Sequence, residues 1–520
     1  MAINSKMLSE GKRNVLQILF GRTMVIIVAL ALQFLLLFAQ LYAVVQYVPY
    51  FVGGVYTLTA IMLIYVLNTK DDPTVKLSWS ILIAVLPVFG TMLYFFAKYE
   101  LGHRLEKRII QSSIEESSRF IPQQEELYEQ LKSEDKQFYN LSRFLYTHGG
   151  NALYQNTAVE YFPLGEMKFD AMRRELEAAE KYIFMEYFII GKGYMWSRIL
   201  EILQRKAAQG VDVRVMYDGT CAVSRLPYGY PKQLKKLGIK CKMFSPLRPF
   251  VSTHYNNRDH RKILVIDGHT AFTGGVNLAD EYINKTHPYG HWKDTAVMLK
   301  GEAVHSFTLM FLQMWNATER SRDFESVLSQ PPVKESGAQG YVIPYCDFPI
   351  GTEHIGKAVY QHILNQAKDY VYIMTPYLIL DNEMISTLSF AAKRGVDVRL
   401  LLPHVPDHKY AAVLAKSHYK ELFDAGVKIY EYTPGFVHAK VFLSDNTTAV
   451  VGTVNLDYRS LYLHYECAAL LYKTPAIADI RADFADTFSK SQCISREDIR
   501  RRPFLTKLAG VLLKVAAPLM

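Results

Sequence analysis

The chain has 520 residues, which is too long for one average domain and long enough to bury several hydrophobic cores. Hydrophobic residues make up 50% and charged residues 21%, with the apolar excess near the N-terminus, so a membrane region joined to a globular region is favoured over a uniformly apolar protein. The formal net charge of +9 favours an anionic partner, and charge alone does not choose between nucleic acid and the negative surface of a bilayer.

The five cysteines are odd in number and widely spaced, and no two of them form a C-x-x-C pair. This pattern argues against a disulfide framework and against a cysteine-based zinc site. We therefore expect reduced structural thiols, which favours a cytosolic position for the globular part.

The first 100 residues are predicted to form a membrane region. Residues 24–45 and 50–67 are apolar runs without a charged residue, so we expect two spans joined by a tight turn rather than a cleavable signal peptide. A third run, residues 77–97, contains Pro87 and Gly90 and is either a third span or a re-entrant segment. Basic residues precede the first run and follow the third, and both groups favour the cytoplasm: Lys6, Lys12, Arg13, Arg22, Lys98, Arg104, Lys107 and Arg108. Both preferences are met if the third run does not cross completely, which predicts a multi-pass cell-membrane protein with its globular part on the cytoplasmic face.

Residues 101–150 are polar and helix-prone, and we interpret them as a helical connector rather than part of a core. A duplication follows, with halves predicted at 151–335 and 336–495. In the first half AAEKYIFMEYFII leads through a helical stretch to GVDVRVMYD, and in the second QAKDYVYIMTPYLIL leads to GVDVRLLLP. The repeated order of strand, helix and strand predicts an α/β fold with two similar halves packed against each other.

Each half carries one copy of the motif H-x-K-x4-D. In the first half HRKILVID supplies His260, Lys262 and Asp267, followed by Gly274 and Asn277 in TGGVN. In the second half HAKVFLSD supplies the equivalent residues, and VGTVN follows; they are His438, Lys440, Asp445, Gly452 and Asn455. All five residues are offset by the same number of positions, which indicates a common origin and a common task.

The spacing within the motif separates its residues by face. Residues two apart on a strand project from the same side, so each His and Lys pair should act together on a substrate. Each Asp lies five residues beyond its Lys and should face the other way. We therefore count Asp267 and Asp445 with the catalytic motif but expect them to hold a turn or bond the scaffold rather than act as bases.

Two H-x-K-x4-D motifs with a trailing G-x-x-N resemble the phospholipase D superfamily. NRDHRK, GGVNLADEY and NLDYRS are similar to its bacterial cardiolipin synthases, and the similarity covers essentially the whole chain. The resemblance implies that the two motifs meet across a pseudo-twofold axis in one active site. It also implies that one histidine becomes a transient phosphohistidine and that no metal or other cofactor takes part.

The residue types suit transfer of a phosphodiester. A neutral imidazole can attack phosphorus, and a second, protonated imidazole can protonate the departing glycerol oxygen. Lys262 and Lys440, with Asn277 and Asn455 as neutral donors, would bind the substrate and stabilise charge on the phosphate oxygens. The acid then activates the incoming hydroxyl. The motifs permit either histidine as nucleophile, and the resemblance favours His260.

Three carboxylates are candidates for further roles. Asp294 in HWKD and Glu466 in HYE each lie downstream of a motif at the start of an apolar strand, and we expect them to orient the catalytic histidines. His464 stands beside Glu466 where the related sequences usually have Asn. Glu186, in FMEYF, is either a substrate-pocket residue or half of a buried ion pair.

The last segment, 496–520, is basic and then apolar, and it resembles a short interfacial helix that contacts anionic membrane lipid, with an ordinary packing helix as the alternative.

The favoured function is a phosphatidyltransferase that joins two phosphatidylglycerol molecules into cardiolipin. A phospholipase D that uses water and forms phosphatidic acid is the alternative enzyme, and a non-catalytic membrane scaffold is disfavoured by two intact motifs. The predicted spans, and the lack of a marked basic groove with aromatic residues, argue against a nucleic-acid partner. The sequence leaves the oligomeric state open.

Overall fold

The computed structural model describes residues 31, 33, 35, 48–98, 103–246, 257–319, 321–329, 333–335, 337–349, 351 and 353–519. The chain divides into two compact units, and the larger comprises Lys107–Pro246 and Asn256–Lys514. The first predicted span, residues 24–45, lies outside the described residues apart from positions 31, 33 and 35.

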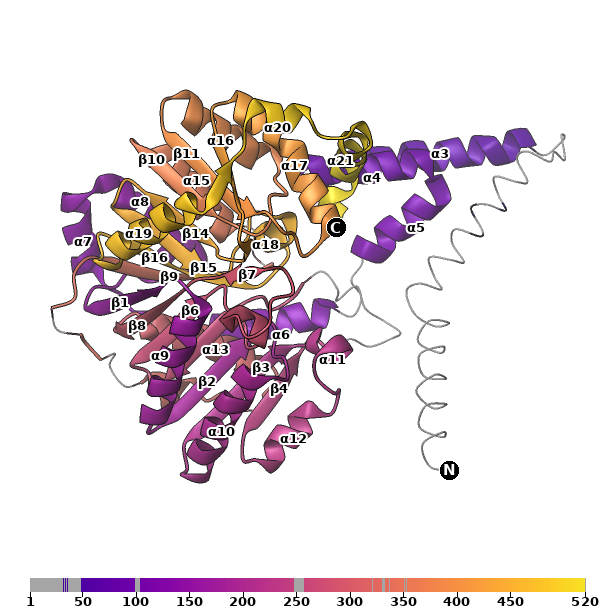
Figure 1. Cartoon of the computed structure of the whole chain (residues 1–520). Helices are drawn as coiled ribbons and strands as arrows, with labels where there is room; N and C mark the ends of the chain where they lie inside the picture. Colours follow the sequence, from indigo (N-terminus) through magenta and orange to yellow (C-terminus); the bar gives the residue numbers. More distant parts are fainter. Residues whose placement is uncertain are drawn as a thin grey trace, which may run out of the picture. The chain divides into compact units, whose positions relative to one another are not determined.

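The larger unit contains two mixed sheets with the same strand order, which confirms the predicted α/β fold with two similar halves (Figure 1). The first sheet has the order β1-β8-β6-β5-β2-β3-β4, and the second has the equivalent order β9-β16-β15-β14-β10-β11-β12 with β17 added at the edge. The strands of the first are β1 Thr157–Phe162, β2 Tyr182–Tyr187, β3 Asp212–Asp218, β4 Lys240–Phe244, β5 Lys262–Ile266, β6 Thr270–Gly274 and β8 Ala296–Gly301. Those of the second are β9 Tyr341–Asp347, β10 Tyr370–Met374, β11 Asp397–Pro403, β12 Lys428–Tyr432, β14 Val441–Ser444, β15 Thr448–Gly452, β16 Glu466–Tyr472 and β17 Ser491–Cys493.

The repeated GVDVR segments turn from a helix into a strand in both halves. Gly210 and Gly395 have φ angles of 92° and 102°, a backbone conformation that residues with a side chain rarely adopt. Each glycine therefore follows the end of a helix, α10 (Tyr194–Ala208) or α16 (Asn382–Lys393), just before the parallel strand β3 or β11 begins.

Helices cover both sheets. They include α9 Gly165–Ala178, α10 Tyr194–Ala208, α11 Cys221–Ser224, α12 Tyr230–Lys236, α13 Val304–Ala317 and α14 Phe324–Leu328, with the 3-10 turn η2 Asp280–Ile283, in the first half. The second half has α15 Ile355–Gln366, α16 Asn382–Lys393, α17 Lys409–Asp424, α18 Tyr458–Tyr462 and α19 Ala476–Ser489. One core cluster joins α13 and α19 to both sheets, and two further clusters pack α9 and α10, or α15 to α17, against the other faces.

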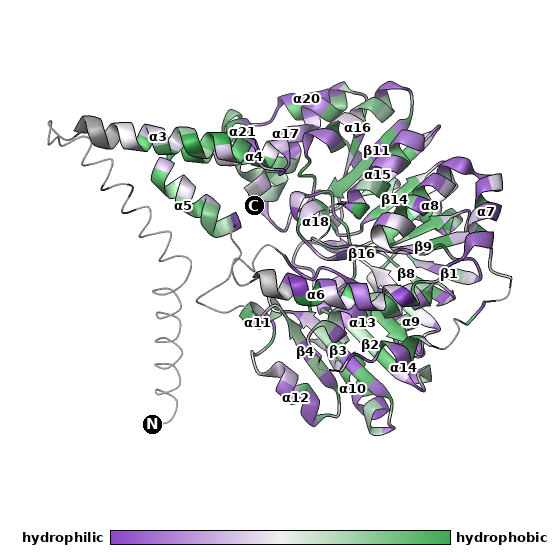
Figure 2. Ribbon diagram, turned by 180° about the vertical axis from the view of Figure 1, so that it is seen from behind, coloured by the Kyte–Doolittle hydropathy of each residue, from purple (hydrophilic) through white to green (hydrophobic). Residues whose placement is uncertain are grey.

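The strands are apolar on both faces because both faces are covered (Figure 2). In β2, Phe184 enters the central cluster while Ile183 and Met185 enter the cluster under α9 and α10. This alternation is the period of two that a strand imposes.

The predicted connector is helical but is more than a connector. It forms α6 His103–Ser117, η1 Ser118–Phe120, α7 Glu125–Glu134 and α8 Lys136–Gly149. Tyr128, Leu131 and Leu145 are buried in the core cluster of the second half. The polar positions gave the segment the appearance of a linker, but its apolar side chains recur on the helix faces that contact the sheet.

In the smaller unit, α3 (Val48–Leu67) covers the second apolar run, and its side chains are described from Gly53 onward. The third run is not one helix but two, α4 Pro73–Val85 and α5 Pro87–Lys98, because Pro87 interrupts the hydrogen-bond ladder. A Cβ at Gly90 would lie 2.8 Å from Leu82 O, so glycine permits close packing of α5 on α4. Within the described part of the chain, no helix meets the length and hydropathy needed to cross a bilayer.

The C-terminal segment forms α20 Arg496–Arg500 and α21 Phe504–Ala516, followed by η3 Ala517–Leu519. α20 begins with a capping box in which Ser495 and Asp498 bond each other's backbone N–H groups. The predicted C-terminal helix is therefore present, and α21 leaves large apolar side chains exposed.

Candidate active site

The two motifs lie at equivalent places, immediately before or at the start of the strands β5 and β14. Lys262 is the first residue of β5, and Lys440 directly precedes β14. His260 and His438 lie two residues earlier, and all four side chains are buried. The ammonium of each lysine donates to the main-chain oxygen of its own histidine, with 2.5 Å between Lys262 Nζ and His260 O. Each His and Lys pair is thereby held as a unit.

The two halves exchange backbone hydrogen bonds at the motifs. His438 N donates to Lys293 O at 2.7 Å, and His260 N donates to Tyr465 O at 2.9 Å. Beside the first of these bonds, the short strands β7 (His291–Lys293) and β13 (Gly435–Val437) pair in parallel across the halves. Each motif histidine therefore lies beside the residue of the other half that directly precedes a carboxylate, Asp294 or Glu466.

This crossing pairs each histidine with the carboxylate of the opposite half. His438 Nδ1 lies 2.7 Å from Asp294 Oδ2, and His260 Nδ1 lies 2.9 and 3.0 Å from the two carboxylate oxygens of Glu466. A carboxylate at Nδ1 favours the tautomer with its proton on Nδ1 and leaves a lone pair on Nε2. The structure thus brings Asp294 and Glu466 to the histidines, in a crossed arrangement.

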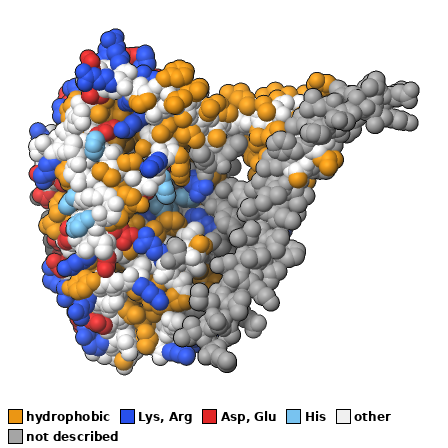
Figure 3. Space-filling view, turned by 45° about the vertical axis from the view of Figure 1, so that its right-hand side comes forward, with side chains coloured by type: hydrophobic (Ala, Val, Ile, Leu, Met, Phe, Trp, Pro, Cys, Tyr) orange, Lys and Arg blue, Asp and Glu red, His pale blue; other side chains and the backbone are white. Residues whose placement is uncertain are grey.

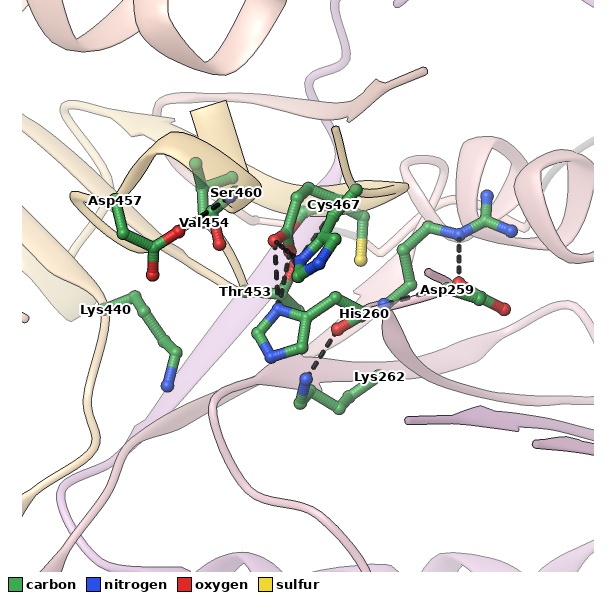
Figure 4. A network of polar contacts seen from close by, with 12 residues as sticks. Asp259, His260, Lys262, Lys440, Thr453, Val454, Asp457, Ser460 and Cys467 are labelled. Carbon is green, nitrogen blue, oxygen red and sulfur yellow. Dashed lines mark hydrogen bonds and ion pairs between the residues drawn. The ribbon is translucent and has the colours of Figure 1, made fainter. Parts of the chain in front are cut away.

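The support of each carboxylate differs between the halves, and sequence reasoning missed it. Thr453 Oγ1 donates to Glu466 Oε2 and accepts from Cys467 N at 3.0 Å (Figure 4). The equivalent position in TGGVN is Gly275, where a Cβ would lie 2.0 Å from Asp294 Oδ1. Asp294 occupies the space that a side chain would need, and its Oδ1 accepts from Thr295 N at 2.8 Å instead. The signal lay in the middle residues of TGGVN and VGTVN.

His464 is the second feature that the motifs do not specify. Its ring centroid lies 5.5 Å from that of His260, and its Nδ1 lies 3.7 Å from Glu466 Oε1. His260, His464 and Glu466 each have a possible metal-ligand atom, and these three atoms lie within 4.8 Å of one another. Among the described residues they form a group that could hold a metal ion. Glu466 also accepts hydrogen bonds from His260 and Thr453.

Burial lowers the pKa values of the two motif histidines and the two motif lysines below their values in water. It lowers the pKa of His260 to about 3 and that of His438 to about 4, so both imidazoles are neutral at neutral pH. Burial also lowers the pKa of Lys262 to about 8 and that of Lys440 to about 7. In the view of Figure 4, the ammonium groups of Lys262 and Lys440 flank the His260 ring. A bound phosphodiester anion would favour the charged forms of all four groups.

Asp267 and Asp445 bond the scaffold at identical positions. Asp267 accepts from the backbone N–H groups of Glu180, Lys181 and Tyr182 at 2.7 to 2.8 Å. Asp445 accepts from the equivalent backbone at 2.7 to 3.0 Å, from Lys368, Asp369 and Tyr370. Both aspartates have positive φ angles, 53° and 50°, at the turn that follows β5 or β14. Their contacts are those of turn anchors.

The two motif asparagines have unequal surroundings. Asn277 donates from Nδ2 to Tyr282 Oη at 2.9 Å and accepts from Ile189 N at 3.0 Å, so its amide already joins two loops. The side-chain oxygen of Asn455 is buried and has no hydrogen-bond partner among the described residues. The substrate-binding role of the two asparagines stays a prediction.

Glu186 forms a fully buried ion pair with Arg261, and Asp259 Oδ1 lies 3.1 Å from Nε of the same arginine. Of the two interpretations of Glu186, the structure supports the buried ion pair. Arg261 follows His260 directly, so the pair fixes the backbone beside the motif histidine.

Comparison with known proteins gives a consistent result. Residues 172–315 and 360–488 match the family model described as "Cardiolipin synthase, PLD-like domain", and residues 57–98 match the phospholipase D-nuclease N-terminal family. The chain is 51% identical to an uncharacterized protein of Streptococcus mutans over 88% of this chain and 99% of that one. It is 32% identical to a cardiolipin synthase of Alkalihalophilus pseudofirmus over 94% of this chain and 98% of that one.

A phosphatidylserine synthase of Haemophilus influenzae shares the fold, with a TM-score of 0.56 at 15% identity over 73% of this chain and 97% of that one. The two ranges that match the cardiolipin synthase model fall on the two halves of the larger unit, which carry the crossed pairs of histidine and carboxylate. The chain belongs to the cardiolipin synthase family of the phospholipase D superfamily.

Proposed function

We propose that this protein is a cardiolipin synthase that transfers the phosphatidyl group of one phosphatidylglycerol to another and releases glycerol. The observation that carries the proposal is the buried pair of motif histidines, each held at Nδ1 by a carboxylate of the opposite half. Two histidines with free Nε2 atoms can divide nucleophilic attack and proton transfer between them. The family membership supplies the substrate class.

In the first step, His260 Nε2 attacks the phosphorus of the first phosphatidylglycerol. The bond between phosphorus and the head-group glycerol oxygen breaks, and His438 donates the proton that glycerol takes with it. Lys262 and Lys440 stabilise the charge on the phosphate oxygens in the transition state. Glu466 and Asp294 stabilise positive charge on the rings to which they are bonded.

In the second step, His438 is neutral and accepts the proton of the glycerol hydroxyl of the second phosphatidylglycerol. That oxygen attacks phosphorus, the bond to His260 breaks, and cardiolipin is released with both histidines restored. Water in place of the second lipid would give phosphatidic acid instead. The low pKa of His438, about 4, means that its acid form depends on the bound phosphate anion.

The same proposal places the protein in the cell membrane, with its catalytic unit on the cytoplasmic face. It rests on the apolar runs at 24–45 and 50–67 and on the exposed apolar side chains of α3, such as Ile61 and Ile64. Lys98 at the end of α5 forms an ion pair of 2.6 Å with Asp71, which precedes α4. This contact supports a re-entrant α4–α5 hairpin whose two ends lie on one side of the bilayer.

Product analysis tests the proposed reaction. Purified full-length chain is incubated with phosphatidylglycerol in detergent, and lipid products are measured together with free glycerol. Equal molar amounts of cardiolipin and glycerol support the synthase. Phosphatidic acid as the single lipid product would overturn it in favour of a hydrolase.

A further inference from the structure

A cavity of about 500 Å³ lies in the larger unit, between α17 and the C-terminal helices α20 and α21, away from both motifs. Seven of its fourteen lining residues are lysine or arginine, and one, Asp424, is acidic. Such a concentration of one sign of charge raises the local potential and attracts anions.

The protein itself neutralises part of this charge. Asp424 pairs with Lys420 at 2.5 Å and with Arg496 at 3.1 Å, and Lys416 pairs with Glu431 at 3.1 Å. The remaining cations are Arg500, Arg502, Lys507 and Lys514, and no carboxylate within the described segments forms an ion pair with them.

The unneutralised cations are held in place by other contacts. Arg502 donates to Lys416 O and lies 4.6 Å from the ring centroid of Tyr419. Lys507 donates to Arg500 O at 2.9 Å. Burial lowers the pKa of Arg502 and of Lys514, and this effect outweighs the opposing charges of Glu431 and Asp498 on Arg502 and of Glu421 on Lys514. A bound anion would offset that cost.

An apolar surface adjoins the cavity. On α21 the side chains of Phe504 and Leu505 are each 75% exposed, Leu512 is 65% exposed, and Val511 is 61% exposed and also lines the cavity. Figure 3 shows hydrophobic side chains beside lysine and arginine side chains on the surface of the described residues. A basic cavity next to an exposed apolar helix face complements a molecule with an anionic head and apolar tails.

From this arrangement we propose that the cavity between α17, α20 and α21 binds the anionic phosphate head of a membrane phospholipid, while α21 lies along the membrane surface. The site is separate from the catalytic motifs. Its ligand is a bilayer lipid rather than free phosphate, because the apolar face of α21 would remain exposed around an inorganic ion. The inference does not rest on the proposed reaction.

Hydrogen exchange on the full-length chain in lipid nanodiscs tests the site. One set of discs contains phosphatidylcholine alone, and the other also contains phosphatidic acid, which has no head-group alcohol to displace. Exchange in residues 496–514 should slow by at least about tenfold in the anionic discs, from about fivefold per cation near an anionic surface. Inorganic phosphate added to phosphatidylcholine discs should give no such protection.

The variant R500Q/K507Q/K514Q should show the same hydrogen exchange in both kinds of disc. The charge-preserving variant R500K/K507R/K514R should keep the slower exchange in the anionic discs. The matched control K136Q/K181Q/K368Q removes three exposed lysines elsewhere on the same unit and should behave as the unmodified chain. Equal exchange in both discs, or a difference that survives R500Q/K507Q/K514Q, would overturn the site. Protection by inorganic phosphate alone would overturn the assignment to a lipid.

Discussion

At the scale of single residues, the two halves of the site differ in how they hold their carboxylates. Glu466 is held by the hydroxyl of Thr453, whereas Asp294 fits against Gly275, which has no side chain. Burial would raise the pKa of Glu466, but the adjacent His260 and the hydrogen bonds to it lower that pKa instead. The two carboxylates therefore reach equivalent nitrogen atoms through different surroundings.

The first prediction concerns Gly275. In Gly275→Ala the new Cβ would lie 2.0 Å from Asp294 Oδ1, so the carboxylate must move away from His438. Turnover should fall by at least about a hundredfold, by comparison with loss of the carboxylate that holds a catalytic imidazole. Gly229→Ala, where nothing lies within 4 Å of the added Cβ, is the matched control. Unchanged cardiolipin formation in Gly275→Ala would show that the bond between Asp294 and His438 is dispensable.

The second prediction concerns pH. Burial lowers the pKa of Lys440 to about 7, and only the ammonium form stabilises phosphate, so kcat/KM should fall as pH rises through that value. Lys440→Arg stays charged, and it should move the alkaline limb to higher pH even if its maximal rate is lower. The measurement is kcat/KM against pH for both proteins at fixed detergent. A profile that stays flat to high pH in the unmodified chain contradicts either the lowered pKa of Lys440 or the need for its charge.

At the scale of elements, the repeated patterns predicted the α/β fold and two strands in each half. The two GVDVR segments, with apolar runs before them, identified β2, β3, β10 and β11 because a buried parallel strand needs such a run. The five-residue step from Lys262 to Asp267 also indicated correctly that the aspartate faces the scaffold. Periodicity was less informative for α7 and α8, whose polar surface concealed the side chains that enter the core.

The third prediction concerns the turn anchors. In Asp267→Ala three backbone N–H groups lose their acceptor, which should lower the free energy of unfolding by about 1.5–3 kcal/mol, the range for a hydrogen bond to a charged group. Turnover of the folded fraction should change by less than about tenfold, because the carboxylate takes no part in proton transfer. Urea unfolding and turnover are measured on Asp267→Ala and on Lys181→Ala as a surface control. A stable variant without activity would instead assign Asp267 to the chemistry.

At the scale of the whole catalytic unit, the central feature is the crossing of the halves, and the sequence could not specify it. Motif spacing records the order along the chain, so Asp294 and Glu466 could be recognised as partners but not assigned to opposite histidines. The assignment depends on long-range pairing, in which His438 bonds Lys293 and His260 bonds Tyr465. Removal of either half should therefore remove part of both histidine environments.

The fourth prediction concerns metals. The proposed reaction uses histidine and lysine side chains, so EDTA should leave cardiolipin formation within about twofold when enough detergent is present to expose the substrate. The control is activity after addition of single divalent ions. Complete loss with EDTA, reversed by one ion, would assign a metal to the group formed by His260, His464 and Glu466.

The most direct test of the account is to locate the covalent intermediate. The protein is mixed with phosphatidylglycerol, quenched rapidly in alkali because phosphohistidine is acid-labile, and digested for peptide mass spectrometry. The account predicts a phosphatidyl adduct on His260. With a substrate whose leaving group needs no proton, the adduct should persist longer in His438→Ala, because attack of the second lipid hydroxyl on the phosphorus of the adduct then lacks its base. An adduct found on His438 alone would reverse the two roles, and no adduct on either histidine would contradict a covalent mechanism.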